Sequence, residues 1–206
     1  PDLSPPRLDR SKNLAHDEKI LNASFLVQDI QLEPLGADKY DAAFSRFGVM
    51  FFDEPKEAFI NIHNSLKDNS PLSFVCWQSP KVNPWHGVAS MVLKQHLDLP
   101  VPEKRAPSPF AFQEPDYIDD ILTTAGFKNI MIEPLALKIL WFADQSLDEA
   151  VFNFMSLNPV IAESMKSVEA ETKDKITNEL SEAFKPFMTD KGLVFDSATW
   201  IVSANK

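Results

Sequence analysis

The stretch Tyr40–Phe52, which reads YDAAFSRFGVMFF, decides the fold. Its apolar run Ala42–Phe44 predicts a short buried strand. The polar and kinked residues Ser45–Gly48 end that strand before apolar residues resume. In open α/β sheets, ligands bind where strands end at their carboxyl edge. The pattern therefore predicts that residues 45–47 form the floor of a ligand site.

The composition is acidic and otherwise typical of a globular protein. The 206 residues include 30 Asp and Glu against 20 Lys and Arg, which gives a formal net charge of −10. This charge repels phosphate backbones and anionic lipids, so nucleic acid and membrane surfaces are poor candidates as partners. No apolar run approaches the roughly 20 residues that span a bilayer, and no signal-peptide pattern opens the sequence. We therefore expect a soluble cytoplasmic protein.

Cysteine and glycine usage excludes several kinds of site. The single cysteine, Cys76, rules out an intrachain disulfide and a cysteine-based zinc site, and no other metal site is expected. Its place inside the apolar run Leu72–Trp77 predicts a buried structural thiol. The five glycines, at positions 36, 48, 87, 126 and 192, are too far apart for a Gly-x-Gly loop. A glycine-rich phosphate or nucleotide loop is therefore not present in this sequence.

Strands and helices are expected to alternate along the rest of the chain. The expected strands, besides Ala42–Phe44, are residues 24–28, 72–77, 127–140 and 193–203; the expected helices are residues 5–15, 55–67, 115–125, 146–155 and 158–187. This alternation favours an α/β fold with a largely parallel sheet. The near-continuous apolar run Leu72–Trp77 favours a strand that is covered on both faces.

Two segments depart from this alternation within a single expected domain, residues 1–206. Pro80–Pro115 is rich in proline and has little periodicity apart from one helix near Met91, so it is interpreted as a lid-like segment. Residues 146–188 form a helical insertion, which opens with the capping box Ser146–Glu149. The insertion is interpreted as a second lid, an ordinary elaboration of the domain or the face of a homodimer.

Several segments, in the right order along the chain, resemble the class I S-adenosylmethionine-dependent methyltransferases. Within that class the chain is similar to the type 11 branch of ubiquinone and menaquinone methyltransferases. Residues 2–5 (DLSP) resemble the end of the family's second strand, residues 27–30 (VQDI) its third-strand motif and residues 41–52 its fourth strand and exit; residues 74–77 and 125–127 add support. The resemblance covers essentially the whole chain.

The resemblance implies a Rossmann-like methyltransferase sheet with a helical insertion before a final antiparallel strand. It also implies a first strand and a Gly-rich loop upstream of Asp2, and neither is in the sequence. The sheet is therefore expected to be incomplete at its N-terminus. We expect this chain to be part of a longer, truncated or cleaved protein.

The resemblance assigns the adenosine half of the cofactor S-adenosyl-L-methionine to four residues. Asp2 would accept hydrogen bonds from the ribose hydroxyls, and Leu3 would pack on the adenine face. Asp29 would accept from the adenine amino group, and the backbone N–H of Ile30 would face a ring nitrogen. The alternative is that Asp2 lies by chance near a helix start and that Asp29 caps a turn.

The methionine half is assigned to the strand exit. Ser45, Arg46 and Phe47 would lie near the transferring methyl group. Arg46 could instead form a structural ion pair, and Phe47 could pack in the core.

The acceptor side is expected in the lid-like segment. His86 is the candidate catalytic base, although a lone histidine in a loop is more often simply solvated. Trp77 and Trp85 are candidates for the walls of an apolar substrate pocket, with core packing as the alternative for Trp77. The predicted function is methyl transfer to a small-molecule acceptor by the complete protein. A non-catalytic, methyltransferase-like binding module is the alternative, and the absent Gly-rich loop favours it.

Overall fold

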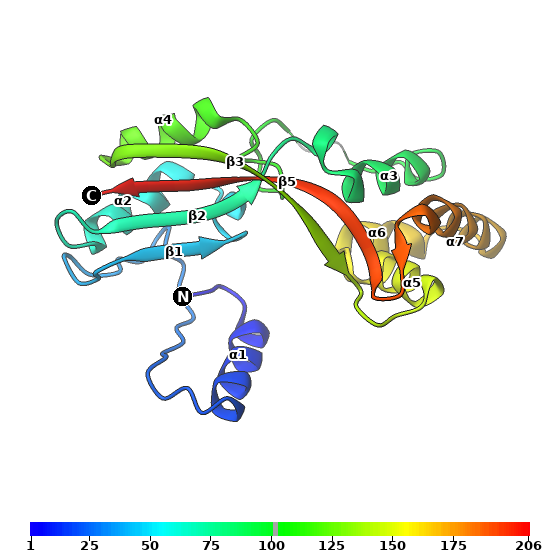
Figure 1. The fold of residues 1–206 in the computed structure, drawn as a ribbon, viewed down its shortest axis with the longest axis horizontal. Coiled ribbons are helices and arrows are strands. Elements are labelled where there is room, and N and C mark those ends of the chain that lie inside the picture. Colours follow the sequence, from blue (N-terminus) through cyan, green and yellow to red (C-terminus); the bar gives the residue numbers. More distant parts are fainter. Residues whose placement is uncertain (101–102) are drawn as a thin grey trace. The chain divides into compact units, whose positions relative to one another are not determined.

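The computed structural model describes residues 1–100 and 103–206, which form an α/β fold around one sheet (Figure 1). The strands are β1 (Ala43–Arg46), β2 (Pro71–Trp77), β3 (Lys128–Trp141), β4 (Met188–Thr189) and β5 (Gly192–Asn205). Their order in the sheet is β1-β2-β5-β3, and β4 pairs antiparallel with β5. The arrows of β1, β2 and β3 point one way and that of β5 the other, so most neighbouring strands are antiparallel.

The helices are distributed between the strands as in an alternating α/β chain. They are α1 (Pro5–Asp17), α2 (Pro55–Ser65), α3 (Pro84–Leu93), α4 (Pro115–Ala125), α5 (Leu147–Leu157), α6 (Pro159–Lys166) and α7 (Ala170–Phe184), with 3-10 turns η1 (Val49–Phe51), η2 (Pro80–Val82) and η3 (Lys185–Phe187). Each of α1 to α4 begins with proline, whose missing N–H costs nothing in a first turn. No helix among the described residues is long and apolar enough to cross a bilayer.

The chain divides into two compact units. The first consists of Pro1–Phe74, Pro115–Ile132 and Val202–Lys206, and the second consists of Val75–Glu114 and Glu133–Ile201. In the first unit, α2 packs against α4, and Phe59 of α2 is fully buried. The Phe59 ring lies 5.5 Å from that of Phe74 and 6.5 Å from that of Phe127.

The core of the second unit is strongly aromatic. Its buried residues come from α3, α5, α6, α7 and β5 and from Leu97 and Phe110, which lie between α3 and α4; they include Trp85, Phe184 and Phe195. The Phe184 and Phe195 rings lie 5.7 Å apart. Helices α5 to α7 precede the antiparallel final strand β5, which confirms the predicted helical insertion and its place in the fold.

Several predictions about strands were wrong. The sheet is mostly antiparallel, not largely parallel, because β5 runs against both of its neighbours. Residues 24–28 form only an isolated parallel bridge between Asp2 and Val27. Strand β1 includes Ser45 and Arg46, which were expected to follow it, and it lies at the sheet edge with Phe44 88% exposed. In β2, Leu72, Phe74 and Cys76 are buried while Pro71 and Ser73 are exposed, so one face is covered and not both.

The helix predictions held except at one break. The Ser146 hydroxyl and the Glu149 carboxylate form the reciprocal capping box, and Gly126 follows α4 with φ of 96°. The single amphipathic helix expected over residues 158–187 is two helices, α6 and α7, separated at residues 167–169. The amphipathic spacing continues across the break, so the apolar pattern gave no signal for it.

Candidate functional site

Asp2 lies at the end of a short extended segment that pairs with residues 26–28. Its N–H donates to the Leu26 carbonyl at 3.1 Å, and its carbonyl accepts from the Gln28 N–H at 3.3 Å. The bridge is parallel, so both segments end at the same edge, and Asp29 follows two residues after Val27. The structure therefore brings the predicted residues Asp2 and Asp29 to neighbouring strand ends.

Both carboxylates also make local contacts. Asp2 Oδ1 accepts the backbone N–H of Ser4 at 2.7 Å, which stabilises the turn into α1. Asp29 Oδ1 accepts from the backbone N–H of Gln31 at 2.9 Å and from its side-chain amide at 3.3 Å. An ionised carboxylate has about four lone-pair sites, so each retains acceptor capacity for a ligand. Leu3, between Asp2 and Ser4, is 61% exposed.

The segment after Asp29 is held by Asn61 on α2. The Asn61 amide nitrogen donates to the carbonyls of Ile30 and Glu33, both at 2.7 Å, and its oxygen accepts from the Leu35 N–H at 3.2 Å. These bonds fix the loop that carries Ile30. The sequence analysis missed Asn61, because a bond between residues 31 positions apart has no local signal.

Gln31, another residue that the sequence analysis missed, links this loop to the start of α2. Its amide nitrogen contacts Asp29 Oδ1, and its oxygen accepts the N–H of Glu54 at 2.8 Å. Glu54 is the residue that precedes α2 and follows η1. The loop of Asp29 and Ile30 is thus connected to the segment that leaves β1.

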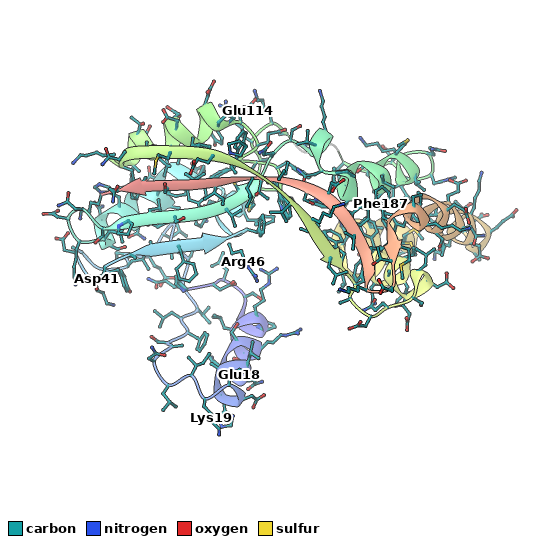
Figure 2. All side chains as sticks on the ribbon, in the orientation of Figure 1. Glu18, Lys19, Asp41, Arg46, Glu114 and Phe187 are labelled. Atoms are coloured by element: carbon teal, nitrogen blue, oxygen red, sulfur yellow. The ribbon has the colours of Figure 1, made fainter. Side chains whose placement is uncertain are left out.

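The exit of β1 has a constrained backbone. Phe47 adopts φ of 54°, in the left-handed region, which is uncommon for a non-glycine residue and costs energy. A Cβ added at Gly48 would lie 3.0 Å from Ser45 Oγ, so the turn folds closely back on the strand. Figure 2 shows Arg46 at the C-terminal end of β1, where it is exposed. Within the described residues Arg46 forms no ion pair.

Trp77 and Trp85 belong to the aromatic cluster of the second unit. Trp85 is only 8% exposed and stacks on Phe110, with ring centroids 5.5 Å apart. Its ring also lies 5.1 Å from Trp77 and 5.0 Å from Trp141. Trp77 is half-buried at the end of β2. The two tryptophans therefore lie together, and Trp85 is part of the core of the second unit.

His86 lies on α3 and not in a loop. Its ring is 4.7 Å from Phe110, and its Nε2 lies 3.3 Å from Ser90 Oγ one turn later. Burial lowers the pKa of His86, and the positive charge of Lys94 lowers it further. A histidine with a lowered pKa is neutral at physiological pH, and the neutral ring is the form that can accept a proton.

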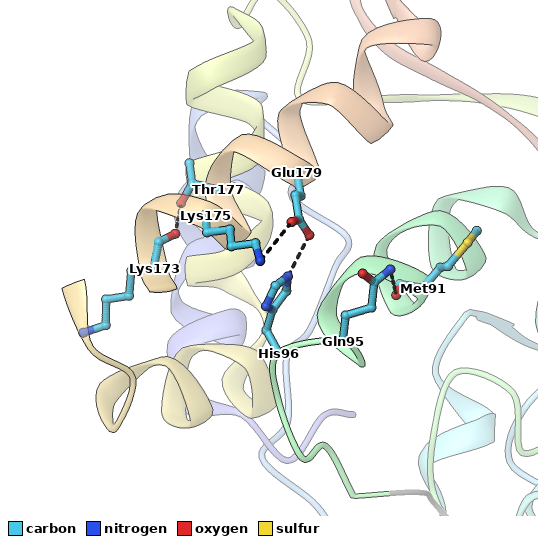
Figure 3. Close-up of polar contacts among 7 residues, drawn as sticks. All are labelled: Met91, Gln95, His96, Lys173, Lys175, Thr177 and Glu179. Atoms are coloured by element: carbon cyan, nitrogen blue, oxygen red, sulfur yellow. Dashed lines mark hydrogen bonds and ion pairs between the residues drawn. The ribbon is translucent and has the colours of Figure 1, made fainter. Parts of the chain in front are cut away.

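The second unit also contains a polar contact that the sequence analysis did not single out. His96 lies in the turn after α3, and its Nε2 is 2.7 Å from Oε2 of Glu179 on α7 (Figure 3). The Nζ of Lys175 lies 4.0 Å from the other carboxylate oxygen, Glu179 Oε1. The His96 side chain is 10% exposed and that of Glu179 is 35% exposed. The pair joins the predicted lid-like segment to the helical insertion.

Comparison with protein families gives one match. Residues 1–74 match the family described as a methyltransferase domain. The matched stretch includes all seven residues predicted to bind the cofactor, from Asp2 to Phe47. No curated protein matches the sequence.

Solved structures with a similar fold cover essentially the whole chain. A proposed methyltransferase from Bacillus halodurans has a TM-score of 0.58 at 15% identity, covering 100% of this chain and 80% of that one. The YcgJ protein from Bacillus subtilis gives the same score and coverage at 12% identity. A phosphoethanolamine N-methyltransferase from Haemonchus contortus, solved with S-adenosyl-L-methionine, has a TM-score of 0.53 at 14% identity, with 100% and 42% coverage. At identities of 12–15%, the similarity shows a shared fold and nothing further.

Proposed function

Because the chain resembles class I S-adenosylmethionine-dependent methyltransferases in the sequence of residues 1–74 and in its fold, we propose that it serves methyl transfer to a small-molecule acceptor. The observation that carries the proposal is the family match, which falls on the segment that contains Asp2, Asp29 and the β1 exit. The phosphoethanolamine methyltransferase among the similar structures has a small molecule bound, which supports the acceptor class.

The residues present suit the adenosine half of the cofactor. Asp2 and Asp29, at neighbouring strand ends, supply carboxylate oxygens for the ribose hydroxyls and the adenine amino group. Leu3 supplies an exposed apolar side chain for the adenine face. Asn61 and Gln31 keep the loop of Asp29 and Ile30 in place.

The methionine half would be held by Ser45, Arg46 and Phe47 together with residues outside this chain. We propose that a further strand with a Gly-rich exit adds to the free side of β1 in the complete protein. The position of β1 at the sheet edge and the 88% exposure of Phe44 support this, since an edge strand presents unpaired backbone groups that favour pairing.

When bound, the cofactor supplies an electrophilic sulfonium methyl group. His86 would take the proton that an acceptor oxygen or nitrogen loses. Its Nε2 lies within hydrogen-bond distance of Ser90 Oγ, so Nδ1 would be the ring nitrogen that accepts this proton. Trp77 and Trp85 would bind apolar parts of the acceptor and exclude water. Orientation of the reacting groups can supply roughly 7–11 kcal/mol of the barrier reduction, so positioning is the main requirement.

Calorimetry and a methyl-transfer assay test the proposal on two forms, this chain and a longer form that includes the encoded residues before Pro1. We expect the longer form to bind S-adenosyl-L-methionine and to methylate small molecules from a panel of phenols, amines and phosphoamines. Cofactor binding without transfer to any member of the panel would argue against the acceptor class. Absence of binding by both forms would contradict the proposal.

The second candidate is a binding module that has lost catalysis. The local hydrogen bonds of Asp2 to Ser4 and of Asp29 to Gln31 favour it, because each carboxylate has a structural use without a ligand. The same calorimetry separates the two candidates, since the module binds no cofactor in either form.

A further inference from the structure

The side chain of Asn83, which lies between η2 and α3, is fully buried and saturated with hydrogen bonds. Its amide nitrogen donates to the carbonyls of Gln78 at 3.3 Å, Ser79 at 3.1 Å and Ala198 at 3.1 Å. Its oxygen accepts from the Ala198 N–H at 3.1 Å and from the Trp85 indole N–H at 3.2 Å. The exposed fraction of Asn83 is 0%. Every polar group of this amide is therefore used.

Asn83 contacts β5 as a strand neighbour would. Strand β2 ends at Trp77, and the Gln78 N–H still pairs with the Ala198 carbonyl at 3.1 Å. Beyond that point the Asn83 side chain takes both the N–H and the carbonyl of Ala198, in place of a further residue of β2. The chain can thus leave the sheet at Gln78 without leaving the Ala198 N–H unpaired.

The same residue begins α3. The Asn83 carbonyl accepts from the N–H groups of His86 at 3.0 Å and Gly87 at 3.3 Å, which closes the first turn of the helix. The first turn contains Trp85 and His86. One residue therefore connects β5 both to the backbone of this turn and to the indole of Trp85.

The contacts of Trp85 and His86 depend on this anchor. The indole ring of Trp85 is fixed at its nitrogen by Asn83 and on its face by Phe110. The His86 ring lies at the edge of the same Phe110 and against Ser90. A shift of the first turn of α3 would move both rings away from Phe110.

We propose that Asn83 is a positioning residue for the acceptor side: it fixes α3 to β5 so that Trp85 and His86 have one arrangement. The inference rests on the acceptor roles proposed for these two side chains. Beyond those roles, the inference is that Asn83, through its bonds to β5, fixes the arrangement of the two side chains without contacting substrate or cofactor.

The test compares Asn83→Ala with Asn61→Ala, a matched variant in the first unit whose amide also bridges backbone groups. NMR titration of the histidine ring protons, with the His86 signal identified by His86→Gln, follows the environment of that ring. In Asn83→Ala we expect the His86 midpoint to rise towards the ordinary value of about 6.5, because the ring becomes more solvated. Asn61→Ala should leave the His86 midpoint unchanged.

A second variant, Trp85→Phe, tests the same His86 midpoint and leaves the Asn83 side chain in place. It replaces the indole by a smaller ring that has no N–H to donate to Asn83, so we expect a smaller rise of the His86 midpoint in a folded protein. If Asn83→Ala fails to fold, this variant decides the question. A folded Asn83→Ala or Trp85→Phe protein with the wild-type His86 midpoint would overturn the inference.

In a catalytically active form, Asn83→Ala should lower kcat and leave the KM for S-adenosyl-L-methionine within twofold of the wild type, whereas Asn61→Ala should raise that KM. Equal effects of the two variants on both constants would contradict a positioning role and indicate a general loss of stability. The histidine titration needs no cofactor and no turnover. Failure of the proposed methyl transfer and failure of this inference are therefore distinguishable.

Discussion

Asp2 pairs with Val27 in an isolated parallel bridge, which aligns the ends of two segments that both carry a carboxylate. The bridge rests on two backbone hydrogen bonds, one on each side of Val27. The loop beyond it depends on Asn61 of α2. The candidate cofactor site therefore depends on a few specific polar contacts more than on a continuous strand.

Replacement of Asn61 by alanine tests that dependence. It leaves the Ile30 and Glu33 carbonyls without their partner, so we expect a loss of about 1–3 kcal/mol in the free energy of unfolding. Urea unfolding measures the loss. Asn13→Ala, at an exposed position on α1, is the control and should change stability by less than about 0.5 kcal/mol. Equal stability of the Asn61 variant and the wild type would show that the loop does not need this anchor.

The turn after α4 requires glycine for two reasons. Gly126 has φ of 96°, and an added Cβ would lie 3.2 Å from His63 Nε2. We expect Gly126→Ala to cost at least about 1–2 kcal/mol, the ordinary penalty of a left-handed residue with a side chain. Gly87→Ala is the matched control, because Gly87 is inside α3 and its added Cβ would be 3.9 Å from the nearest atom. Thermal unfolding should show a lower Tm for the first variant and an unchanged or higher Tm for the second.

Two partly buried histidines should make the protein less stable in mild acid. The pKa of His63 is lowered by burial and then by Lys206, and that of His86 by burial and then by Lys94. The unfolded chain therefore binds these protons more tightly than the fold does. Their contribution to stability is present above the ordinary pKa of about 6.5 and is lost as the pH falls below it.

Urea unfolding between pH 8 and pH 5 measures this effect. We expect the free energy of unfolding to fall with pH in the wild type and to fall less in the double variant His63→Gln, His86→Gln. His16→Gln, at an exposed position on α1, should retain the wild-type slope. A slope that is the same in all three proteins would exclude these two histidines as the cause.

Cys76 should be unreactive in the folded protein. Burial raises the pKa of its thiol to about 12, and the thiol lies 3.9 Å from the Phe112 carbonyl. Since the thiolate is the reactive form, a disulfide reagent at pH 8 should modify it only after unfolding. Rapid reaction in buffer without denaturant would mean that β2 opens readily at Cys76.

Local signals in the sequence predicted the fold well where they act over a few residues. The Ser146–Glu149 capping box and the helix starts at Pro5, Pro55 and Pro115 all lie where expected. The strand patterns were less informative: the run around Phe44 looked buried, because an apolar sequence does not tell whether a neighbouring strand is present to cover it.

The candidate site was predictable only in part. The resemblance supplied Asp2, Asp29 and the residues that end β1, and the structure brings the first two to neighbouring strand ends. Asn61 and Asn83 were missed. Their partners lie up to 115 residues away, and such bonds leave no periodic or motif signal in one sequence.

The central claim is that Asp2 holds the cofactor, and the affinity for S-adenosyl-L-methionine of the form that binds it tests this most directly. Calorimetry should show that Asp2→Asn weakens binding at least about tenfold, the effect of losing about 1.4 kcal/mol of a charge-assisted hydrogen bond. Asp9→Asn, which removes an exposed carboxylate on α1 paired with Lys12, should leave the affinity unchanged. Equal affinities of the Asp2→Asn and wild-type proteins would contradict the account.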